Sequence, residues 1–340
     1  MSRPPLSRLR PDPYILGLLS TVVVATVLPA SGGFAGVVSA LTNVAIGLLF
    51  FLYGARLSAK ETVEGLRNWR LHLTVFLSTF ALFPLLGLAA GLLSPGLLSE
   101  PLYSGVLYLC FLPSTVQSSI AFTSTARGNI AAAICSASLS SLLGIALTPL
   151  LVGLLIDTGG AGFSAQSAVD IVFQLLIPFL LGQFCRRWIG EWMARHQTAL
   201  GRYDRGTIFF IVYTAFSQGV VSGIWQQIAP GELVVLAALE IALLAAVLAS
   251  THFASRLLGF PEADRTAIVF CGSKKSLATG LPMANVLFPG GMVGLIVLPV
   301  MLFHQLQLIV CAMLANRKAR TGAPAATAGP GGEAAIAGTS

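Results

Sequence analysis

Ten stretches of the sequence are each long and apolar enough to cross a lipid bilayer. A membrane helix needs roughly 20 predominantly apolar residues. Windows of about that length lie at 13–30, 34–57, 69–93, 101–125, 129–156, 166–186, 206–225, 233–257, 264–288 and 292–315. The short alternating segments of a transmembrane barrel do not occur. The sequence therefore predicts an all-α, polytopic, multi-pass membrane protein with ten transmembrane helices.

The composition agrees with a membrane protein. Hydrophobic residues make up 55% of the chain and charged residues 10%, whereas a soluble domain carries about 25% charged residues. The net charge of +7 would suggest nucleic acid as a partner of a soluble chain, but here we expect membrane lipid and no nucleic acid. The cysteines lie inside apolar segments without metal-ligand spacing, so we expect packing thiols, no metal and no cofactor.

The basic residues indicate how the ten helices are oriented. Eighteen of the twenty Lys and Arg residues fall in the two termini, in alternate loops or in the span ends that border those loops, and the five opposite loops contain none. Loops rich in Lys and Arg stay in the cytoplasm. Both termini are therefore expected to be cytoplasmic, in a bacterial inner membrane or a plasma membrane. The first apolar run resembles a secretory signal, but its length favours a retained helix.

Two similar segments suggest an internal repeat. Gln117–Ala121 in the fourth helix aligns with Lys274–Ala278 in the ninth, and the helices that follow share interior prolines, Pro149 and Pro299. A repeat of five helices must insert upside down relative to its copy, as in secondary transporters. The predicted organisation is a cytoplasmic tail (1–12), two inverted five-helix repeats (13–157 and 165–316) and a disordered tail (321–340).

The fourth and ninth helices contain residues that interrupt helices. Pro113 precedes a run of Ser, Thr and Gln, and the ninth helix contains Gly272, Gly280 and Pro282. Such residues free backbone groups that must then line a cavity. Paired breaks in matching helices point to a binding site at the middle of the bilayer. The alternative is that Gly and Pro are simply common in membrane helices.

Lys274 and Lys275 lie side by side in the ninth helix. They are roughly 14 Å from the cytoplasmic end and 22 Å from the other end at about 1.5 Å per residue. Each lysine at such a depth costs about 2.5–3.5 kcal/mol. Both lysines could reach a water-filled vestibule, or they could form an ion or substrate site. Their charges would attract an anion, and a lysine removed from water can release its proton near neutrality.

The motifs "LPSTVQSSIAFTSTARGN" and "FCGSKKSLATGLPMAN", together with the ten helices, resemble the bile acid:sodium symporter family. The resemblance covers about residues 10–318, and it points to the sodium/bile acid cotransporter 7-like branch. It implies a panel domain and a core domain, with broken helices four and nine crossing in the core. It also implies that sodium-symporting members hold two sodium ions behind that crossing.

The chain departs from the sodium-symporting members of that family. Their helix-nine motif is Glu-x-Gly-x-Gln-Asn, and Phe270 stands here in place of the glutamate, with Lys274 and Lys275 in place of the Gln-Asn pair. In helix four, Ser118 and Ser119 replace Ser-Asn. Our hypothesis is that a lysine replaces the sodium charge, so that transport is coupled to H+ or uncoupled. Symport with Na+ is the alternative.

Other polar residues inside the helices have less specific interpretations. Glu240 could pair with a lysine or relay protons, or it could face water. His304, Gln305 and Gln307 suggest a polar seam of structural hydrogen bonds. Further amides suggest contacts between helices, and the tryptophans suggest interfacial anchors: Asn43, Gln174, Gln183, Trp69, Trp188, Trp192 and Trp225.

We expect a secondary transporter of a small organic anion rather than an enzyme. A Ser–Lys dyad is chemically conceivable, but no His or Asp partner and no oxyanion motif accompanies it. A non-transporting membrane regulator or scaffold with the same fold stays open. The expected substrate or ion site consists of Lys274, Lys275, Ser273, Ser276, Gln117, Ser118, Ser119 and Glu240.

Overall fold

The computed structural model describes residues 13–56, 68–94, 96–156, 165–223, 226, 228–288 and 290–321. Within these ranges the chain is helical, with no strand. The two terminal tails expected from the sequence lie outside the described residues, as does most of the basic loop after the second helix.

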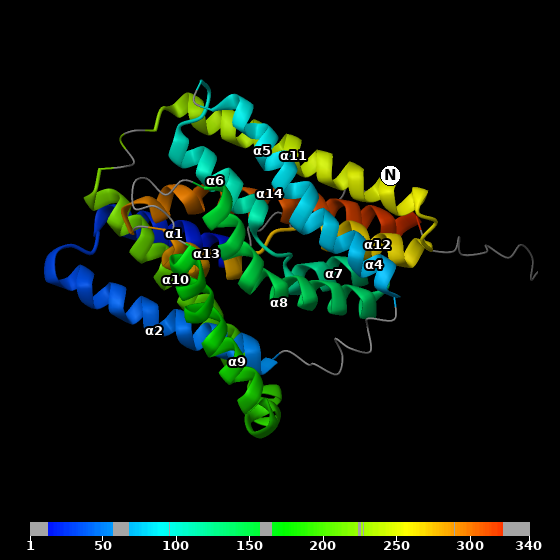
Figure 1. Cartoon of the computed structure of the whole chain (residues 1–340), viewed down its shortest axis with the longest axis horizontal. Helices are drawn as coiled ribbons and strands as arrows, with labels where there is room; N and C mark the ends of the chain where they lie inside the picture. Colours follow the sequence, from blue (N-terminus) through cyan, green and yellow to red (C-terminus); the bar gives the residue numbers. More distant parts are fainter. Residues whose placement is uncertain are drawn as a thin grey trace, which may run out of the picture.

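Helices occupy every segment in which the sequence predicts one (Figure 1). The first half contains α1 (Pro13–Val27), α2 (Gly32–Arg56), α4 (Trp69–Leu77), η3 (Ser78–Leu82), α5 (Phe83–Ala90), η4 (Gly91–Leu93), α6 (Glu100–Phe111), α7 (Val116–Thr125) and α8 (Ile130–Leu155). The second half contains α9 (Ala165–Arg195), α10 (Gln197–Val221), α11 (Pro230–Leu257), α12 (Glu262–Gly272), α13 (Leu277–Leu287) and α14 (Gly290–Thr321).

Several of these helices have the length and hydrophobicity of membrane spans. Among the described residues, five helices meet both criteria, or six if the bent pair α6 and α7 counts as one span. The protein is therefore an all-helical, multi-pass membrane protein, while the full count of ten crossings stays a prediction. The largest difference in bounds concerns α9 and α10, which extend toward each other well beyond the predicted spans and meet at His196.

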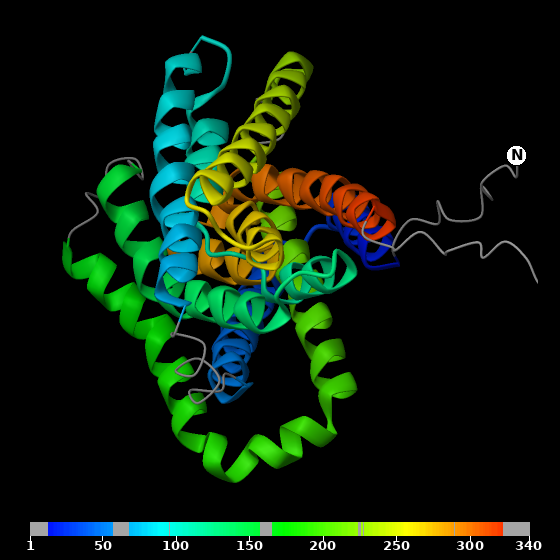
Figure 2. The ribbon, with the colours of Figure 1, turned by 90° about the vertical axis from the view of Figure 1, so that its right-hand side faces the viewer.

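Helices α1, α2, α9 and α10 form one group of packed helices, which contacts the rest of the chain through α10 with α13 and α14 and through α9 with α8 (Figures 1 and 2). In this group α2 packs on α9 and on α10, and α1 packs on α10. Helices α2 and α9 touch through their backbones. A Cβ added to Gly54 would lie 1.9 Å from the carbonyl oxygen of Phe179, and one added to Gly182 would lie 1.9 Å from that of Phe51. Small residues allow such close packing of membrane helices.

The other group contains α4 to α8 and α11 to α14. The main apolar cluster runs from α6 through α13 to α14, and it continues into the first group because it also takes in residues of α1, α2, α5, α8, α9, α10 and α11. Phe83 and Phe303 meet edge to face in this cluster with ring centroids 6.0 Å apart, as do Tyr108 and Phe288 at 5.2 Å. The two interrupted helices therefore lie inside a packed core.

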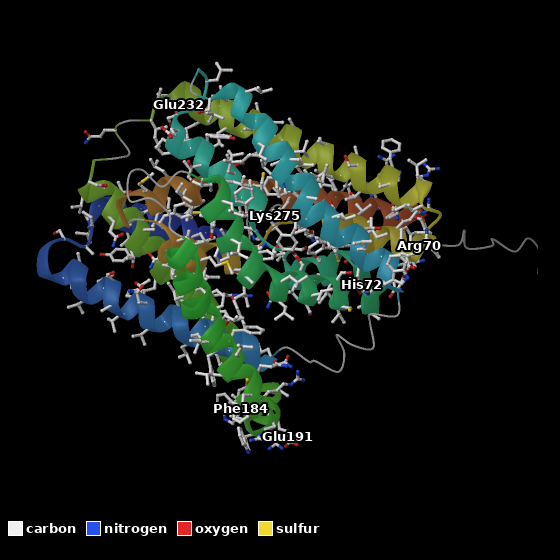
Figure 3. All side chains as sticks on the ribbon, viewed as in Figure 1. Arg70, His72, Phe184, Glu191, Glu232 and Lys275 are labelled. Atoms are coloured by element: carbon white, nitrogen blue, oxygen red, sulfur yellow. The ribbon has the colours of Figure 1, made fainter. Side chains whose placement is uncertain are left out.

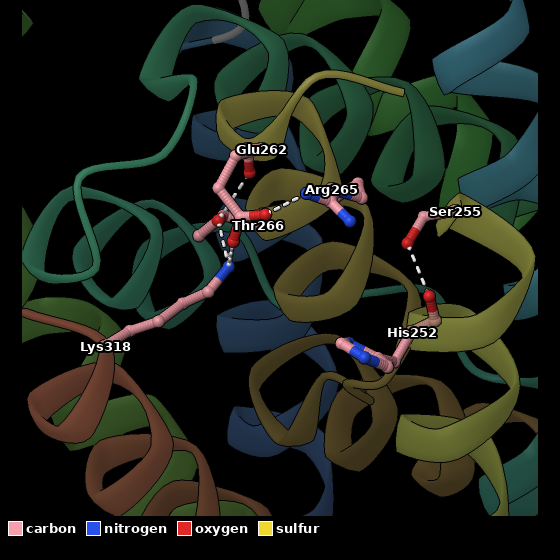
Figure 4. Close-up of polar contacts among 6 residues, drawn as sticks. All are labelled: His252, Ser255, Glu262, Arg265, Thr266 and Lys318. Carbon is pink, nitrogen blue, oxygen red and sulfur yellow. Dashed lines mark hydrogen bonds and ion pairs between the residues drawn. The ribbon is translucent and has the colours of Figure 1, made fainter. Parts of the chain in front are cut away.

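An ion pair ties α12 to the last turns of α14 (Figure 4). Glu262 pairs with both Arg265 and Lys318. The Lys318 ammonium also donates a 2.7 Å hydrogen bond to Thr266 Oγ1. Asp264, close by, accepts hydrogen bonds from Asn68 at 3.0 Å and Asn129 at 2.8 Å. This end of the core group is thus held by charged and polar side chains from four segments.

Candidate functional site

Two of the predicted helices, the fourth and the ninth, are interrupted. Helix α6 ends at Phe111 and α7 begins at Val116, with a bend of 61° between them. Leu112 is extended, with φ −69° and ψ 151°, because the residue before a proline is disfavoured in the α conformation. In the second half α12 ends at Gly272 and α13 begins at Leu277.

The two breaks lie against each other. The backbone N–H of Ser276 donates a 2.9 Å hydrogen bond to the carbonyl oxygen of Pro113. Thr115 Oγ1 donates to the carbonyl oxygen of Lys275 at 2.8 Å, and Ser114 Oγ donates to that of Cys271 at 2.6 Å. Residues about 160 positions apart therefore form one polar centre inside the helical core.

Serine hydroxyls satisfy the free carbonyls at the end of α12. The last carbonyls of a helix have no partner within it. Here the carbonyl oxygen of Phe270 accepts from Ser119 Oγ at 3.1 Å, and that of Gly272 accepts from Ser78 Oγ at 2.9 Å. With the bond from Ser114 to Cys271, three serines from two other segments cap this helix end.

The ammonium of Lys275 satisfies free backbone carbonyls around the break after α6. The side chain is only 1% exposed, and Figure 3 shows Lys275 in the middle of the molecule, between Glu232 toward one end and Arg70 toward the other. Its Nζ donates hydrogen bonds to the carbonyl oxygens of Thr79 at 2.9 Å, Cys110 at 2.8 Å and Leu112 at 2.7 Å. A buried charge becomes tolerable when all its donors are used and helix-end dipoles face it.

The three carbonyls are free because of the local backbone. In the π-helical turn η3 the N–H of Phe83 donates to Ser78, and Pro84 has no N–H to give to Thr79. Ser114, four residues after Cys110, directs its N–H to Ser140 Oγ at 2.9 Å. The carbonyl of Leu112 lies in the break itself. Prolines and a π-helical turn therefore leave these carbonyl oxygens without backbone donors, and the oxygens surround one cation.

Gln307 of α14 fixes the backbone of Lys275. Its Oε1 accepts from the backbone N–H of Lys275 and its Nε2 donates to the carbonyl oxygen, both at 2.8 Å. The Nε2 of Gln307 also lies 2.9 Å from Nδ1 of His304. The sequence suggested a polar seam on this helix. In the structure Gln307 of this seam forms hydrogen bonds with the backbone of the break between α12 and α13.

Lys274 lies in a different environment from its neighbour. Its side chain is 0% exposed, and Nζ has no hydrogen-bond partner among the described residues. The ammonium lies 3.9 Å from the centroid of the Phe122 ring and 5.6 Å from that of Phe270. Contacts with ring faces stabilise a cation only in part. Of two adjacent buried lysines, one is fully bonded and the other is not.

The other predicted site residues are either buried without a described partner, bonded at the end of α12, or placed at the start of α13. Ser118 Oγ is buried, and no described residue bonds it. Ser273 donates to the carbonyl oxygen of Val269 at 2.6 Å, and Ser276 caps α13 by accepting from the N–H of Thr279 at 3.2 Å. Glu240 is 0% exposed, and neither of its carboxylate oxygens has a partner in the part of the chain that the structure describes. Of the readings open for Glu240, neither a lysine partner nor exposure to water is seen among the described residues, and a role as a proton relay stays a prediction.

Two of the expected helix breaks are also wrong. Gly280 and Pro282 lie inside α13, which continues through both to Leu287. The N–H of Gly280 donates to Ser276 at 2.9 Å, and its carbonyl accepts from the Tyr108 hydroxyl at 2.6 Å. The helix tolerates Pro282 because one proline removes a single backbone bond, which neighbouring groups in a membrane protein can compensate.

Gln117 faces a cavity instead of the lysines. This cavity, of about 490 Å³, lies between α7 and the helices α2, α9 and α10. Its polar lining includes a paired guanidinium and carboxylate, in which Arg56 bonds both oxygens of Asp204 at 2.5 and 3.2 Å. The lining residues are Ala55, Arg56, Gln117, Arg186, Gly190, Met193, Ala194, Gln197, Leu200, Gly201 and Asp204.

Sequence reasoning missed the groups that hold Lys275. Backbone carbonyls leave no trace in a residue pattern, but Pro84 in the third predicted helix was a usable signal. The serines that cap α12 were also missed at Ser78 and Ser114. Hydroxyl residues in an apolar helix indicate free carbonyls nearby, and both serines could have been read in that way.

The sequence profile of the SBF-like CPA transporter family matches residues 12–320. A relative from Escherichia coli (strain K12), named "Putative symporter YfeH", is 52% identical over 91% of this chain and 93% of its own. Sodium/bile acid cotransporter 7-B of Xenopus laevis is 30% identical over 91% and 92%, and sodium/bile acid cotransporter 7 of Mus musculus is 28% identical over 91% and 93%. The resemblance read from the two motifs is confirmed.

Proposed function

Because the chain belongs to the SBF-like CPA transporter family, and is therefore a transporter rather than an enzyme, we propose that it is a secondary transporter of a small organic anion, coupled to protons or uncoupled. The observation that carries this proposal is the unequal bonding of the two buried lysines. Lys275 uses its donors on backbone carbonyls, whereas the ammonium of Lys274 forms no hydrogen bond within the described ranges.

In this proposal Lys275 is a tethered cation. Carbonyl oxygens grouped around a positive charge are the usual surroundings of a bound metal cation in a membrane protein. Here a covalently attached ammonium fills them, and it links η3, α6 and the second break. The ring of Phe270, which stands where the resemblance places a sodium-binding glutamate, packs toward Phe122 with centroids 6.1 Å apart. Both features argue against coupling to sodium.

Lys274 is the group that we assign to transport. A buried ammonium without hydrogen-bond acceptors is unstable in its charged form. Its free energy falls either when it loses its proton or when it binds an anion. A carboxylate, sulfonate or phosphate that reaches Lys274 would supply the missing acceptor. Proton release and anion binding are therefore alternatives at one atom, which is the basis for coupling them.

The packing of the helices supports two inverted repeats. Several helix contacts occur in pairs: replacing each helix by its counterpart in the other half turns one contact of the pair into the other, although the contacts of α10 with α14 and of α9 with α8 have no counterpart of similar extent. Helix α2 packs on α9 as α10 packs on α1, α7 packs on α8 as α13 packs on α14, and α14 packs on α6 as α8 packs on α12. An inverted pair of repeats with both termini in the cytoplasm accounts for these pairs and for the distribution of Arg and Lys.

Transport measured in proteoliposomes tests the proposal. Pools of small carboxylates, sulfonates and phosphate monoesters would be offered with a pH gradient, with a sodium gradient and with neither. We expect uptake of at least one pool that is independent of sodium and is lost in Lys274→Met. Sodium-driven uptake would support the sodium symporter instead. Absence of uptake for all pools by a folded protein would favour the regulator or scaffold.

A further inference from the structure

The turn between α9 and α10 presents an exposed aromatic face. Phe184, Trp188 and Trp192 are 59%, 59% and 53% exposed, and their spacing of four residues places them on one side of α9. Figure 3 shows Phe184 and Glu191 near this turn, far from Lys275. Soluble surfaces seldom leave three large aromatic side chains exposed in a row.

The same face changes character along the helix. Toward the start of α9 its exposed residues are aliphatic, namely Ile177, Leu180 and Leu181. Toward the turn they become aromatic. This order matches the passage from the hydrocarbon of a bilayer to its headgroup region, where Trp side chains concentrate. The face therefore crosses the membrane boundary at about Phe184, close to where the sequence predicts the span to end.

An arginine is held at that boundary. The guanidinium carbon of Arg187 lies 3.7 Å from the centroid of the Trp188 ring and 4.6 Å from that of Phe184, and these two rings meet edge to face. In the described part of the chain Arg187 forms no ion pair. The nearby acids are engaged elsewhere, because Glu191 pairs with Arg195 at 3.5 Å and Asp204 with Arg56.

We propose that this face of α9, which we define by Phe184, Arg187, Trp188 and Trp192, binds the headgroup of an anionic phospholipid. The guanidinium of Arg187 donates to the lipid phosphate, and the two tryptophans fix the depth of the turn. Arginine suits this role because its planar fork of donors matches phosphate oxygens and its flat surface stays on the rings. Exposed Arg202 on α10 adds positive charge on the other side of the turn.

Fluorescence quenching by brominated lipids tests the site. A variant with Trp69→Phe and Trp225→Phe keeps only Trp188 and Trp192 as fluorophores, and it would be placed in vesicles of phosphatidylcholine and phosphatidylglycerol with bromine on one lipid at a time. We expect brominated phosphatidylglycerol to quench more strongly than brominated phosphatidylcholine at equal content. Arg187→Gln should remove this difference.

Arg256→Gln is the matched control, because it removes one exposed guanidinium at the end of α11 and should keep the preference. Equal quenching by the two lipids in the unmodified background would overturn the proposal. So would quenching by neither lipid, particularly if mass photometry then shows a second copy of the chain. If Arg256→Gln lost the preference as strongly as Arg187→Gln, the net charge of the protein would explain the lipid preference, and the proposed site would also be overturned.

Discussion

The ammonium of Lys275 donates a 2.7 Å hydrogen bond to the carbonyl oxygen of Leu112. Leu112 is the residue at which α6 leaves the helical conformation, and Lys275 lies in the break between α12 and α13. One side chain therefore ties the two interruptions together. The ammonium of Lys274, the adjacent residue, has no hydrogen bond to any described residue, so the two lysines should respond differently to the same substitution.

Lys275→Met should destabilise the protein strongly. It leaves three buried carbonyl groups without a donor, and each unsatisfied group costs about 1–3 kcal/mol. We expect a loss of about 3 kcal/mol or more in the free energy of unfolding, measured as a lower midpoint in detergent. Lys318→Met serves as the control, because the pair of Lys318 with Glu262 is partly exposed and such pairs contribute about 0–1 kcal/mol. Equal effects in the two variants would refute the role of Lys275.

Lys274→Met should leave stability unchanged or raise it, while transport is lost. Replacing a buried charge that has no partner by an apolar side chain of similar length removes a desolvation cost. Uptake should nevertheless fall at least about tenfold, equivalent to about 1.4 kcal/mol in the barrier. Unfolding midpoints and initial uptake rates, measured on the same preparation, separate the two effects. Normal uptake would exclude Lys274 from the mechanism.

Much of this architecture is predictable from the sequence, for identifiable reasons. Hydrophobic length locates the helices, and Pro113 locates one break, because a proline restricts the residue before it. Gly280 and Pro282 mislead, since a single proline can be accommodated in a packed helix. The difference between Lys274 and Lys275 could not be predicted, because it depends on which carbonyls distant turns leave free. Those carbonyls depend on the three-dimensional arrangement of η3, α6 and α12.

Gly54→Ala should disturb the contact between α2 and α9. The new methyl group would lie 1.9 Å from the carbonyl oxygen of Phe179, so the helices must move apart, at a cost of about 1–3 kcal/mol or more. Gly47→Ala, on the same helix with no atom within 4 Å of its Cβ, is the control and should be neutral or slightly stabilising. Equal unfolding midpoints of the two variants in detergent would contradict the close contact.

Glu262 should make the end of the core group sensitive to acid. Its hydrogen bond with Lys318 holds the pKa of Glu262 below its ordinary value of 4.5. A lowered pKa in the folded state stabilises the protein above the ordinary value, and this contribution disappears as the pH falls through the folded-state value. The unfolding midpoint of Glu262→Gln should therefore fall less between pH 6 and pH 3, roughly the window in which such carboxylates titrate. A parallel fall in both proteins would contradict the assignment.

Binding of sodium itself tests the central claim most directly, because it needs no knowledge of the substrate. The claim is that the ammonium of Lys275 occupies the carbonyl ring that a cation would otherwise fill. Equilibrium binding of radioactive sodium to the purified protein, competed with unlabelled sodium, should show no saturable component. Saturable and competable binding of sodium to the unmodified protein would contradict the account.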